Sequence, residues 1–124
     1  MAWDASMINL DEAITRSMGR KELYKGWLDG FFRDETFEPV DKAFTNNDNT
    51  AAEAALHKLK GTAGNLAVKK VHVLAEDMCA RVKAGETTDS MTGDLEKLRE
   101  DFVNARTMYN DNIDELLNYG ELIF

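Results

Sequence analysis

A histidine with small and basic neighbours is the clearest candidate for chemistry in this sequence. Lys60 and Gly61 follow His57 at three and four residues, which is one turn away in a helix. A neutral imidazole nitrogen is a good nucleophile near pH 7, because the ordinary pKa of histidine is about 6.5. An ammonium group one turn away can stabilise an anion at that nitrogen. The combination therefore indicates transfer of an anionic group to a histidine.

The position of His57 in its own segment predicts an exposed side chain. Residues 50–65 predict a helix, and at 100° per residue its apolar side chains fall in one sector that must face a core (Ala52, Leu56, Leu59, Ala63 and Leu66). His57 lies about 150° from the centre of that sector. Gly61 and Gly64 lie close to it, so we expect bare backbone that lets a bulky group approach the imidazole. For Gly64, close packing against another helix is an equally good explanation.

The charge around His57 differs from that of the whole chain. The 124 residues contain 15 Lys and Arg against 23 Asp and Glu, which gives a formal net charge of −8. Between Ala54 and Ala75 there are four lysines and no acidic residue (Lys58, Lys60, Lys69 and Lys70). Such a surface favours an anionic group or partner at this place, although an ordinary solvated surface can look the same. The acidic balance argues against a general nucleic-acid binder, which needs a basic face.

Composition excludes several other classes of protein. The single cysteine, Cys79, rules out an intramolecular disulfide framework, and its apolar surroundings predict a core residue in a cytoplasmic protein. No apolar run approaches the roughly 20 residues of a membrane span, and no signal peptide is recognisable at the start. We therefore expect one domain over residues 1–124, with its core at about 9–117 and no membrane contact.

Helical patterns run along the whole chain, and no stretch alternates as a strand would. The first predicted helix is Leu10–Met18 with Asn9 as its cap, followed by an apolar stripe from Tyr24 through Trp27 and Leu28 to Phe31. A short helix with Pro39 in its first turn comes next, and then the 50–65 helix, with Thr50 and Glu53 as a capping box. Two further apolar stripes predict helices from Val68 to Val82 and, over a longer stretch, from Leu95 to Leu116. We expect an all-α antiparallel four-helix bundle with additional short N-terminal helices. Apolar residues beyond the last helix should pack back onto it (Tyr119, Leu122, Ile123 and Phe124).

The residues around His57 also resemble a known family. His57-Lys58-Leu59-Lys60-Gly61, with Leu66 five residues later, is similar to the H-x-L-K-G…L-G signature of histidine-containing phosphotransfer (HPt) domains of bacterial-type two-component phosphorelays. Ala67 stands where that signature has its second glycine, which affects the turn between two helices. The resemblance extends over roughly residues 9–117.

This resemblance implies a phosphoryl carrier that is not a kinase in its own right. His57 would accept a phosphoryl group from the aspartyl phosphate of a response-regulator receiver domain, such as that of a hybrid histidine kinase, and pass it to another receiver. Lys60 would stabilise the charge of the phosphoryl group, and Lys58, Gly61 and Gly64 would contact the partner. No cofactor or metal is expected on this chain, and Mg²⁺ is expected in the receiver.

Two other interpretations use the same residues. A helical docking module would bind a receiver or another signalling protein without being phosphorylated, although docking alone needs no nucleophile. A metal site would use two i,i+4 pairs (Glu53 with His57, and His72 with Glu76), but helical di-metal sites use Glu-x-x-His and inward-pointing ligands. For His72 we expect a surface pair with Glu76. By the resemblance, the receiver also meets parts of the Lys21–Phe32 and Asp41–Thr45 segments. Phe32 lies at the edge of its stripe and is a candidate for this contact, although burial in the core is the better explanation of its position.

Overall fold

The computed structural model describes residues 3–119 of the chain. Its elements, in chain order, are α1 (Leu10–Arg16), α2 (Lys21–Phe31), α3 (Asp34–Thr45), α4 (Asn49–Asn65), α5 (Lys69–Lys83), the 3₁₀ turn η1 (Thr88–Met91), α6 (Thr92–Asp111) and α7 (Ile113–Leu117). Within these residues the only β-type pairing is an isolated bridge between Ile8 and Val68. The prediction of an all-α protein is confirmed.

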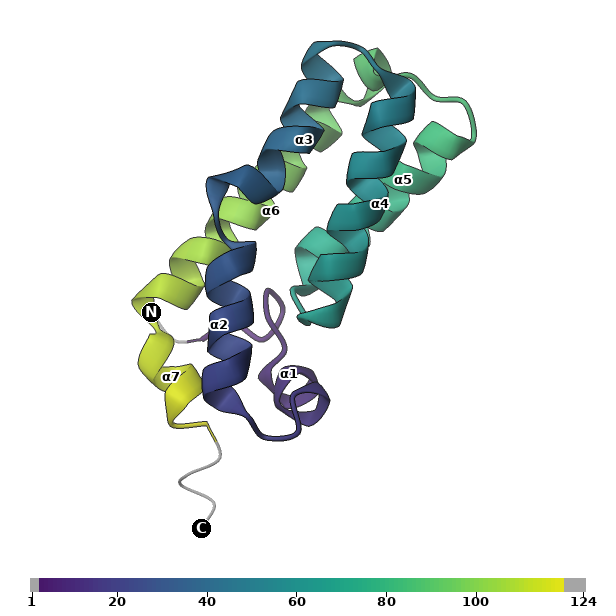
Figure 1. The fold of residues 1–124 in the computed structure, drawn as a ribbon. Coiled ribbons are helices and arrows are strands. Elements are labelled where there is room, and N and C mark those ends of the chain that lie inside the picture. The colour runs from purple at the N-terminus through teal and green to yellow at the C-terminus, as the bar shows by residue number, and fades with distance from the viewer. Residues whose placement is uncertain (1–2, 120–124) are drawn as a thin grey trace.

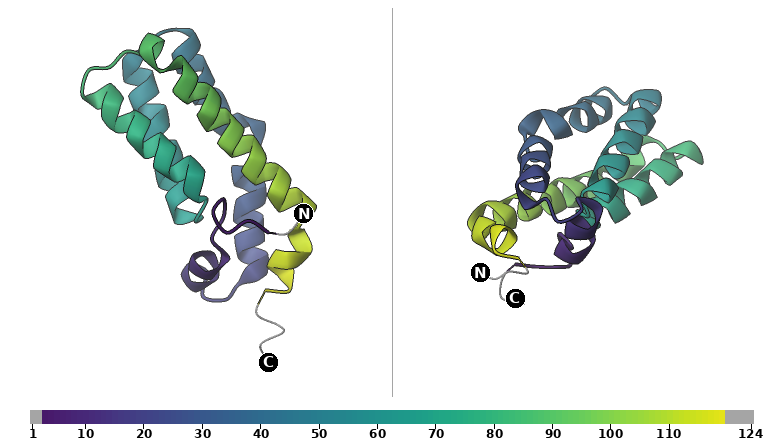
Figure 2. Two further views of the ribbon diagram at one scale, coloured as in Figure 1. Left: turned by 180° about the vertical axis from the view of Figure 1, so that it is seen from behind. Right: turned by 60° about the horizontal axis from the view of Figure 1, so that its bottom comes forward.

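The long helices form an antiparallel four-helix bundle. In Figure 1, α3, α4, α5 and α6 lie side by side, and α2 continues the line of α3 towards the end where α1 and α7 lie. The view from behind in Figure 2 shows α6 running along α3 and past the upper part of α2, with α7 beyond its end. The additional short helices thus lie at one end, and one of them, α7, comes from the C-terminal side of the chain.

Arg106 of α6 holds the break between α2 and α3. Its guanidinium donates to the carbonyl of Phe32 at 3.2 Å and to Oδ1 of Asp34 at 2.9 Å. The same group lies over the ring of Phe102, 5.5 Å from the ring centre. The first contact satisfies a carbonyl at the end of α2 that a continuous helix would have satisfied itself, and the second ties the start of α3 to α6.

A cluster of aromatic rings fills the core where α2, α3 and α6 meet. Its members are all buried, and neighbouring ring centres lie 5.2–5.6 Å apart (Phe31, Phe32, Phe37, Phe102 and Tyr109). The expected burial of Phe32 and of Cys79 is confirmed. Trp27, which we placed in the apolar stripe of α2, is instead 44% exposed. The stripe of α2 is therefore narrower than its spacing suggested.

The segment before α1 is joined to the turn that follows α4. The amide of Asn9 donates to the carbonyl of Ala67 at 3.0 Å, and the amide of Lys69 donates to the carbonyl of Met7 at 2.8 Å. The hydroxyl of Tyr24 donates to the carbonyl of Leu66. Burial raises the pKa of this phenol, so it remains a donor over the whole physiological range. The end of the His57 helix is thus fixed by residues from the first quarter of the chain.

Two predicted helix ends in the first half of the chain are wrong. α1 ends at Arg16 rather than Met18, because Met18 itself turns into the left-handed region at φ 58° before Gly19 at φ 79°. α3 begins at Asp34, so Pro39 lies inside the helix and not in its first turn. The exposed ring of Pro39 removes one backbone hydrogen bond, but burial of Phe37 and Val40 on the opposite side offsets that cost.

Two further helix ends also differ from the prediction. Asp48, not Thr50, caps α4, since its Oδ1 accepts a hydrogen bond from the amide of Ala51 at 3.0 Å. The long C-terminal stripe is divided at Asn112, whose backbone leaves the helical region at φ −134° and ψ 34°. The cap of α1 is confirmed, because Oδ1 of Asn9 accepts from the amide of Glu12 at 3.2 Å. Tyr119 packs against the core, whereas Leu122, Ile123 and Phe124 lie outside the described residues.

Candidate functional site

His57 lies near the middle of α4 on its exposed face. The helix packs against α3 on one side and α5 on the other, and its apolar side chains face the core, with Leu56 and Leu59 buried beside the histidine. The imidazole is exposed, as its position in the helix predicted. Within residues 3–119 no hydrogen bond or ion pair engages it. The side chain therefore presents its ring nitrogens to solvent.

The two glycines beside His57 have different surroundings. A Cβ added at Gly61 would meet no atom within 4 Å, so the space next to the imidazole is open. A Cβ added at Gly64 would lie 2.8 Å from Nδ1 of His72, which is too close for a real contact. Gly64 therefore has a packing reason of its own. Its contact with a partner remains a prediction, as does that of Gly61.

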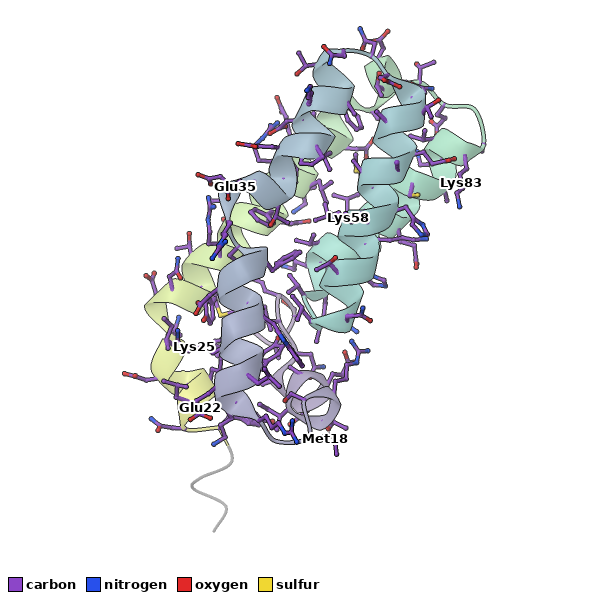
Figure 3. The ribbon with its side chains drawn as sticks, in the orientation of Figure 1. Met18, Glu22, Lys25, Glu35, Lys58 and Lys83 are labelled. Carbon is purple, nitrogen blue, oxygen red and sulfur yellow. The ribbon has the colours of Figure 1, made fainter. Side chains whose placement is uncertain are left out.

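The two lysines that flank His57 point to opposite sides of α4. Lys58 lines a groove of about 860 Å³ between α4 and the α2–α3 junction, which we call the junction groove. Figure 3 shows Lys58 on the side of α4 that faces α2 and α3. Lys60 lines a smaller pocket of about 280 Å³ between α4, α1 and the start of α5, together with Arg16 and Lys69; we call it the basic pocket. In the described part of the chain, neither Lys58 nor Lys60 takes part in an ion pair.

His72 of α5 is bound on both of its ring nitrogens. Nδ1 donates to the carbonyl of Lys60 at 2.8 Å, and Nε2 lies 3.7 Å from Oε2 of Glu76. The predicted surface pair of His72 with Glu76 is thus confirmed. No group of three or more His, Cys, Asp or Glu side chains within residues 3–119 is placed to hold a metal ion.

Two features of the site were not predicted from the sequence. Arg16 of α1 donates to the carbonyl of Gly64, 48 residues away, and so becomes a wall of the basic pocket. Leu23 and Trp27 of α2 are 42% and 44% exposed, which places two apolar side chains on the surface of this helix. A long-range contact of Arg16 has no signal in local spacing. The exposure of Trp27 depends on where α2 meets its neighbours.

Comparison with known proteins identifies both the family and the fold of this chain. A family model described as Hpt domain matches residues 32–108, which is more than half of the chain. The crystal structure of the HPT domain from the Hpt sensor hybrid histidine kinase of Shewanella superposes with a TM-score of 0.75 at 19% sequence identity, covering 90% of this chain and 97% of that one. No curated protein matches the sequence. None of the described helices has the length and apolar character needed to cross a membrane.

The family match includes the whole His57 segment. Residues 32–108 contain α3, α4, α5 and most of α6, which are the four helices of the bundle. Hpt domains are phosphocarriers, not kinases, and they interact with receiver domains in two-component phosphorelays. The chain belongs to the Hpt domain family and has a phosphotransfer role in two-component signal transduction.

Proposed function

We propose that His57 is the residue that carries the phosphoryl group. It accepts the group from the aspartyl phosphate of one receiver domain and passes it to an aspartate of another. The contrast between the two histidines of the chain supports this assignment. The imidazole of His57 is exposed and unbound within residues 3–119, whereas both ring nitrogens of His72 have partners. The open space at Gly61 lets a receiver approach the free ring.

The transfer needs an uncharged nitrogen and a stabilised anion. A lone pair of the His57 imidazole attacks phosphorus on the side opposite the aspartyl oxygen. The P–N bond forms as the P–O bond breaks, and the aspartate leaves with the electron pair. The reverse sequence loads the next receiver. Lys60, one turn along α4, supplies an ammonium group for the phosphoryl oxygens, whereas Lys58 lies on the other flank and contributes less.

The metal ion of the reaction belongs to the partner in this proposal. Phosphoryl transfer requires cations that neutralise the charge on the moving group, and Mg²⁺ performs this role in many phosphotransfer sites. We expect the Mg²⁺ and its carboxylate ligands in the receiver domain. This chain would then bind no cofactor of its own, and would contribute the histidine and Lys60.

The receiver has a groove of mixed polarity to dock on beside α4. The junction groove is lined mainly by charged and polar residues, with Lys58 at its α4 side and the buried Phe31 and Leu59 at its base. Leu23 and Trp27 add exposed apolar side chains on α2. We expect the receiver to cover α4, the junction groove and this face of α2. The Lys21–Phe32 segment would therefore take part through its exposed residues, and the contact expected at Asp41–Thr45 remains a prediction.

Transfer from a labelled receiver tests this proposal directly. The chain is incubated with a panel of receiver domains phosphorylated with ³²P, including receivers of hybrid histidine kinases. We expect label that is labile in acid and stable in base on the wild-type chain and on His72→Gln, and none on His57→Gln. His72→Gln is the matched control, because it removes the other histidine. Clean labelling of His57→Gln would overturn the assignment.

The same experiment separates the carrier from a docking module. A docking module would bind a receiver, measured by calorimetry, without acquiring label on any histidine. A carrier acquires the label and gives it up to a second, unphosphorylated receiver. Binding without label on the wild-type chain across the panel would favour the docking module over the carrier.

A further inference from the structure

The basic pocket brings together cations from three helices. Arg16 comes from α1, Lys60 from α4 and Lys69 from α5, and the pocket between them has a volume of about 280 Å³. The pocket is also lined by Gly61, one turn of α4 from His57. It lies on the side of α4 opposite to the junction groove, because Lys58 lines the groove and Lys60 lines the pocket.

Hydrogen bonds fix the walls of this pocket. Arg16 donates to the carbonyl of Gly64, which anchors α1 against the end of α4. Nδ1 of His72 donates to the carbonyl of Lys60 at 2.8 Å, which anchors α5 against the same turn. The missing Cβ of Gly64 makes that second contact possible, because a Cβ would lie 2.8 Å from Nδ1 of His72. These two contacts therefore join α1 and α5 to α4 at the pocket.

Two of the three cations already contact a carboxylate of their own chain. Nζ of Lys69 lies 3.2 Å and 3.1 Å from the two carboxylate oxygens of Glu12, and Arg16 lies 3.9 Å from Oε2 of the same residue. A second carboxylate, on Glu76, lies on the outer side of His72. Lys60 has no carboxylate partner among residues 3–119. Within these residues the three cations thus have one carboxylate partner between them, so the pocket keeps an excess of positive charge in a chain whose formal net charge is −8.

We propose that the basic pocket receives an acidic side chain of the receiver that docks over His57. This inference rests on the proposed function, because it assigns part of the docking surface of that receiver. Lys69 and Arg16 supply the donors, and Glu12 competes with the incoming carboxylate for both, while Lys60 serves the phosphoryl oxygens. The receiver then lies across α4 with one contact in the junction groove and an ionic contact in the basic pocket. Such charge pairs mainly raise the rate of association and select between partners.

Charge variants in the pocket give effects of opposite sign. Arg16→Gln and Lys69→Gln should each lower kcat/KM for transfer from a receiver roughly two- to fivefold at low salt, which is the range of a single exposed charge pair. Glu12→Gln should raise it by a similar factor, because the competing carboxylate is removed. Lys83→Gln is the matched control, since Lys83 is an exposed lysine at the far end of α5 (Figure 3), and it should leave the rate unchanged.

The salt dependence and the sign of the Glu12→Gln effect distinguish an electrostatic role of the pocket from a structural one. The changes in kcat/KM of all three variants should become smaller at about 0.5 M salt, where screening extends over only a few ångströms. If the Glu12–Lys69 contact were only structural, Glu12→Gln would instead lower kcat/KM for transfer, as Lys69→Gln does. That result, or equal rates for Arg16→Gln, Lys69→Gln and Lys83→Gln, would overturn the proposal.

A binding measurement separates this proposal from the proposed function. His57→Gln labelled with ¹⁵N is titrated with a hexaglutamate peptide at low salt, with hexalysine as the control. We expect the amide signals of Gly61 and Gly64 to shift with hexaglutamate alone, and the shifts to be lost when Lys69→Gln is added. If no receiver loads His57, the proposed function fails although these shifts remain. If transfer is normal but the shifts are absent, the basic pocket is not a site for acidic side chains.

Discussion

Single residues around His57 show how one helix face can combine access with close packing. Gly61 faces open space, whereas Gly64 makes room for the ring of His72. Both glycines are unfavourable for a helix, by roughly 1 kcal/mol each relative to alanine. The structure gives a local reason for Gly64 and none for Gly61, for which the proposed function supplies one in the approach of a receiver.

Alanine at the two glycines should change stability in opposite directions. Gly61→Ala should raise the free energy of unfolding by about 1 kcal/mol, because alanine favours the helix and its Cβ meets nothing. Gly64→Ala should lower it by about 1–3 kcal/mol, because the Cβ displaces His72. Urea denaturation measures both. In a His72→Ala background the loss at Gly64 should disappear, and a persistent loss would contradict this explanation.

A large side chain at Gly61 should slow phosphotransfer without disturbing the fold. Gly61→Leu places its side chain in the open space next to His57, so a receiver cannot approach as closely. We expect the transfer rate to fall by roughly tenfold or more, since small misplacements of reacting groups cost up to 10² in rate. Circular dichroism checks the fold, and Gly61→Ala is the control with a minimal side chain. Equal rates for Gly61→Leu and the wild type would contradict the role of open space.

The two lysines beside His57 should differ in their effect on the reaction. Lys60→Ala should slow phosphorylation of His57 roughly tenfold, less than the 10²–10³ lost in enclosed sites because the surface is partly solvated. Lys58→Ala removes the same charge on the other flank and should have a smaller effect. Single-turnover transfer from a phosphorylated receiver, at saturating receiver, measures the chemical step. The reverse order would show that Lys58 is the charge-stabilising lysine.

The sequence predicted the exposure of His57 because helical periodicity determines which way a side chain points. Five apolar residues of α4 define its buried side, and the histidine lies opposite (Ala52, Leu56, Leu59, Ala63 and Leu66). The place of Arg16 could not be predicted in this way. Its contact with the carbonyl of Gly64 depends on the packing of α1 against α4, which no local pattern specifies.

At the scale of the elements, the helices were easier to predict than their ends. The end of α4 at Asn65 was predicted correctly, yet its start was placed two residues late at Ala51, because Thr50 and Glu53 match a capping box. Asp48 is an equally good cap by residue type, and the structure uses it. The start of α3 was predicted wrongly for a related reason. Proline is usual in a first turn, but burial of Phe37 extends α3 on the N-terminal side of Pro39.

Alanine substitutions at the two candidate caps test which residue begins α4. Asp48→Ala should lower the free energy of unfolding by about 1 kcal/mol, because the amide of Ala51 loses its acceptor. Thr50→Ala should change it by a few tenths of a kcal/mol at most, since Thr50 is an exposed residue of the first turn. Thermal and urea unfolding of both variants provide the comparison. A larger loss for Thr50→Ala would restore the capping box.

Ala67 gives a physical account of a departure from the HPt signature. Its backbone lies at φ 60°, in the left-handed region that favours glycine. Alanine is tolerated there because the residue is buried and its carbonyl accepts from Asn9. The signature of the family thus predicted a feature of the turn between α4 and α5 even where this chain carries a different residue.

At the scale of the whole molecule, one arginine joins the far end of the bundle. Arg81 of α5 contacts Glu86 in the following connection, with Nε 2.6 Å from Oε2, and Asp94 of α6, with Nη1 3.0 Å from Oδ2. It also lies 3.4 Å from Asp77, one turn back on α5. The hydrogen bond from Arg81 holds the pKa of Glu86 below its usual range.

The lowered pKa of Glu86 predicts part of the acid sensitivity of the fold. Folded chains bind a proton at Glu86 less readily than unfolded chains, so the stabilisation is present above the ordinary glutamate pKa and is lost as the pH falls through the lowered value. Between about pH 6 and pH 3, Glu86→Gln should therefore lose less stability than the wild type. Urea unfolding at several pH values measures the slope. Glu38→Gln, which removes an exposed carboxylate outside this cluster, should keep the wild-type slope.

The pairing of residues 7–9 with residues 67–69 has a practical consequence for fragment design. Recombinant fragments trimmed to the family match, residues 32–108, would lack Tyr24 and the strand-like stretch around Ile8. The buried turn at Leu66, Ala67 and Val68 would then be exposed to water, and the carbonyl groups of Leu66 and Ala67 would lose their hydrogen-bond donors. A fragment that begins before Trp3 keeps these hydrogen bonds, and so preserves the C-terminal end of α4, the helix that bears His57.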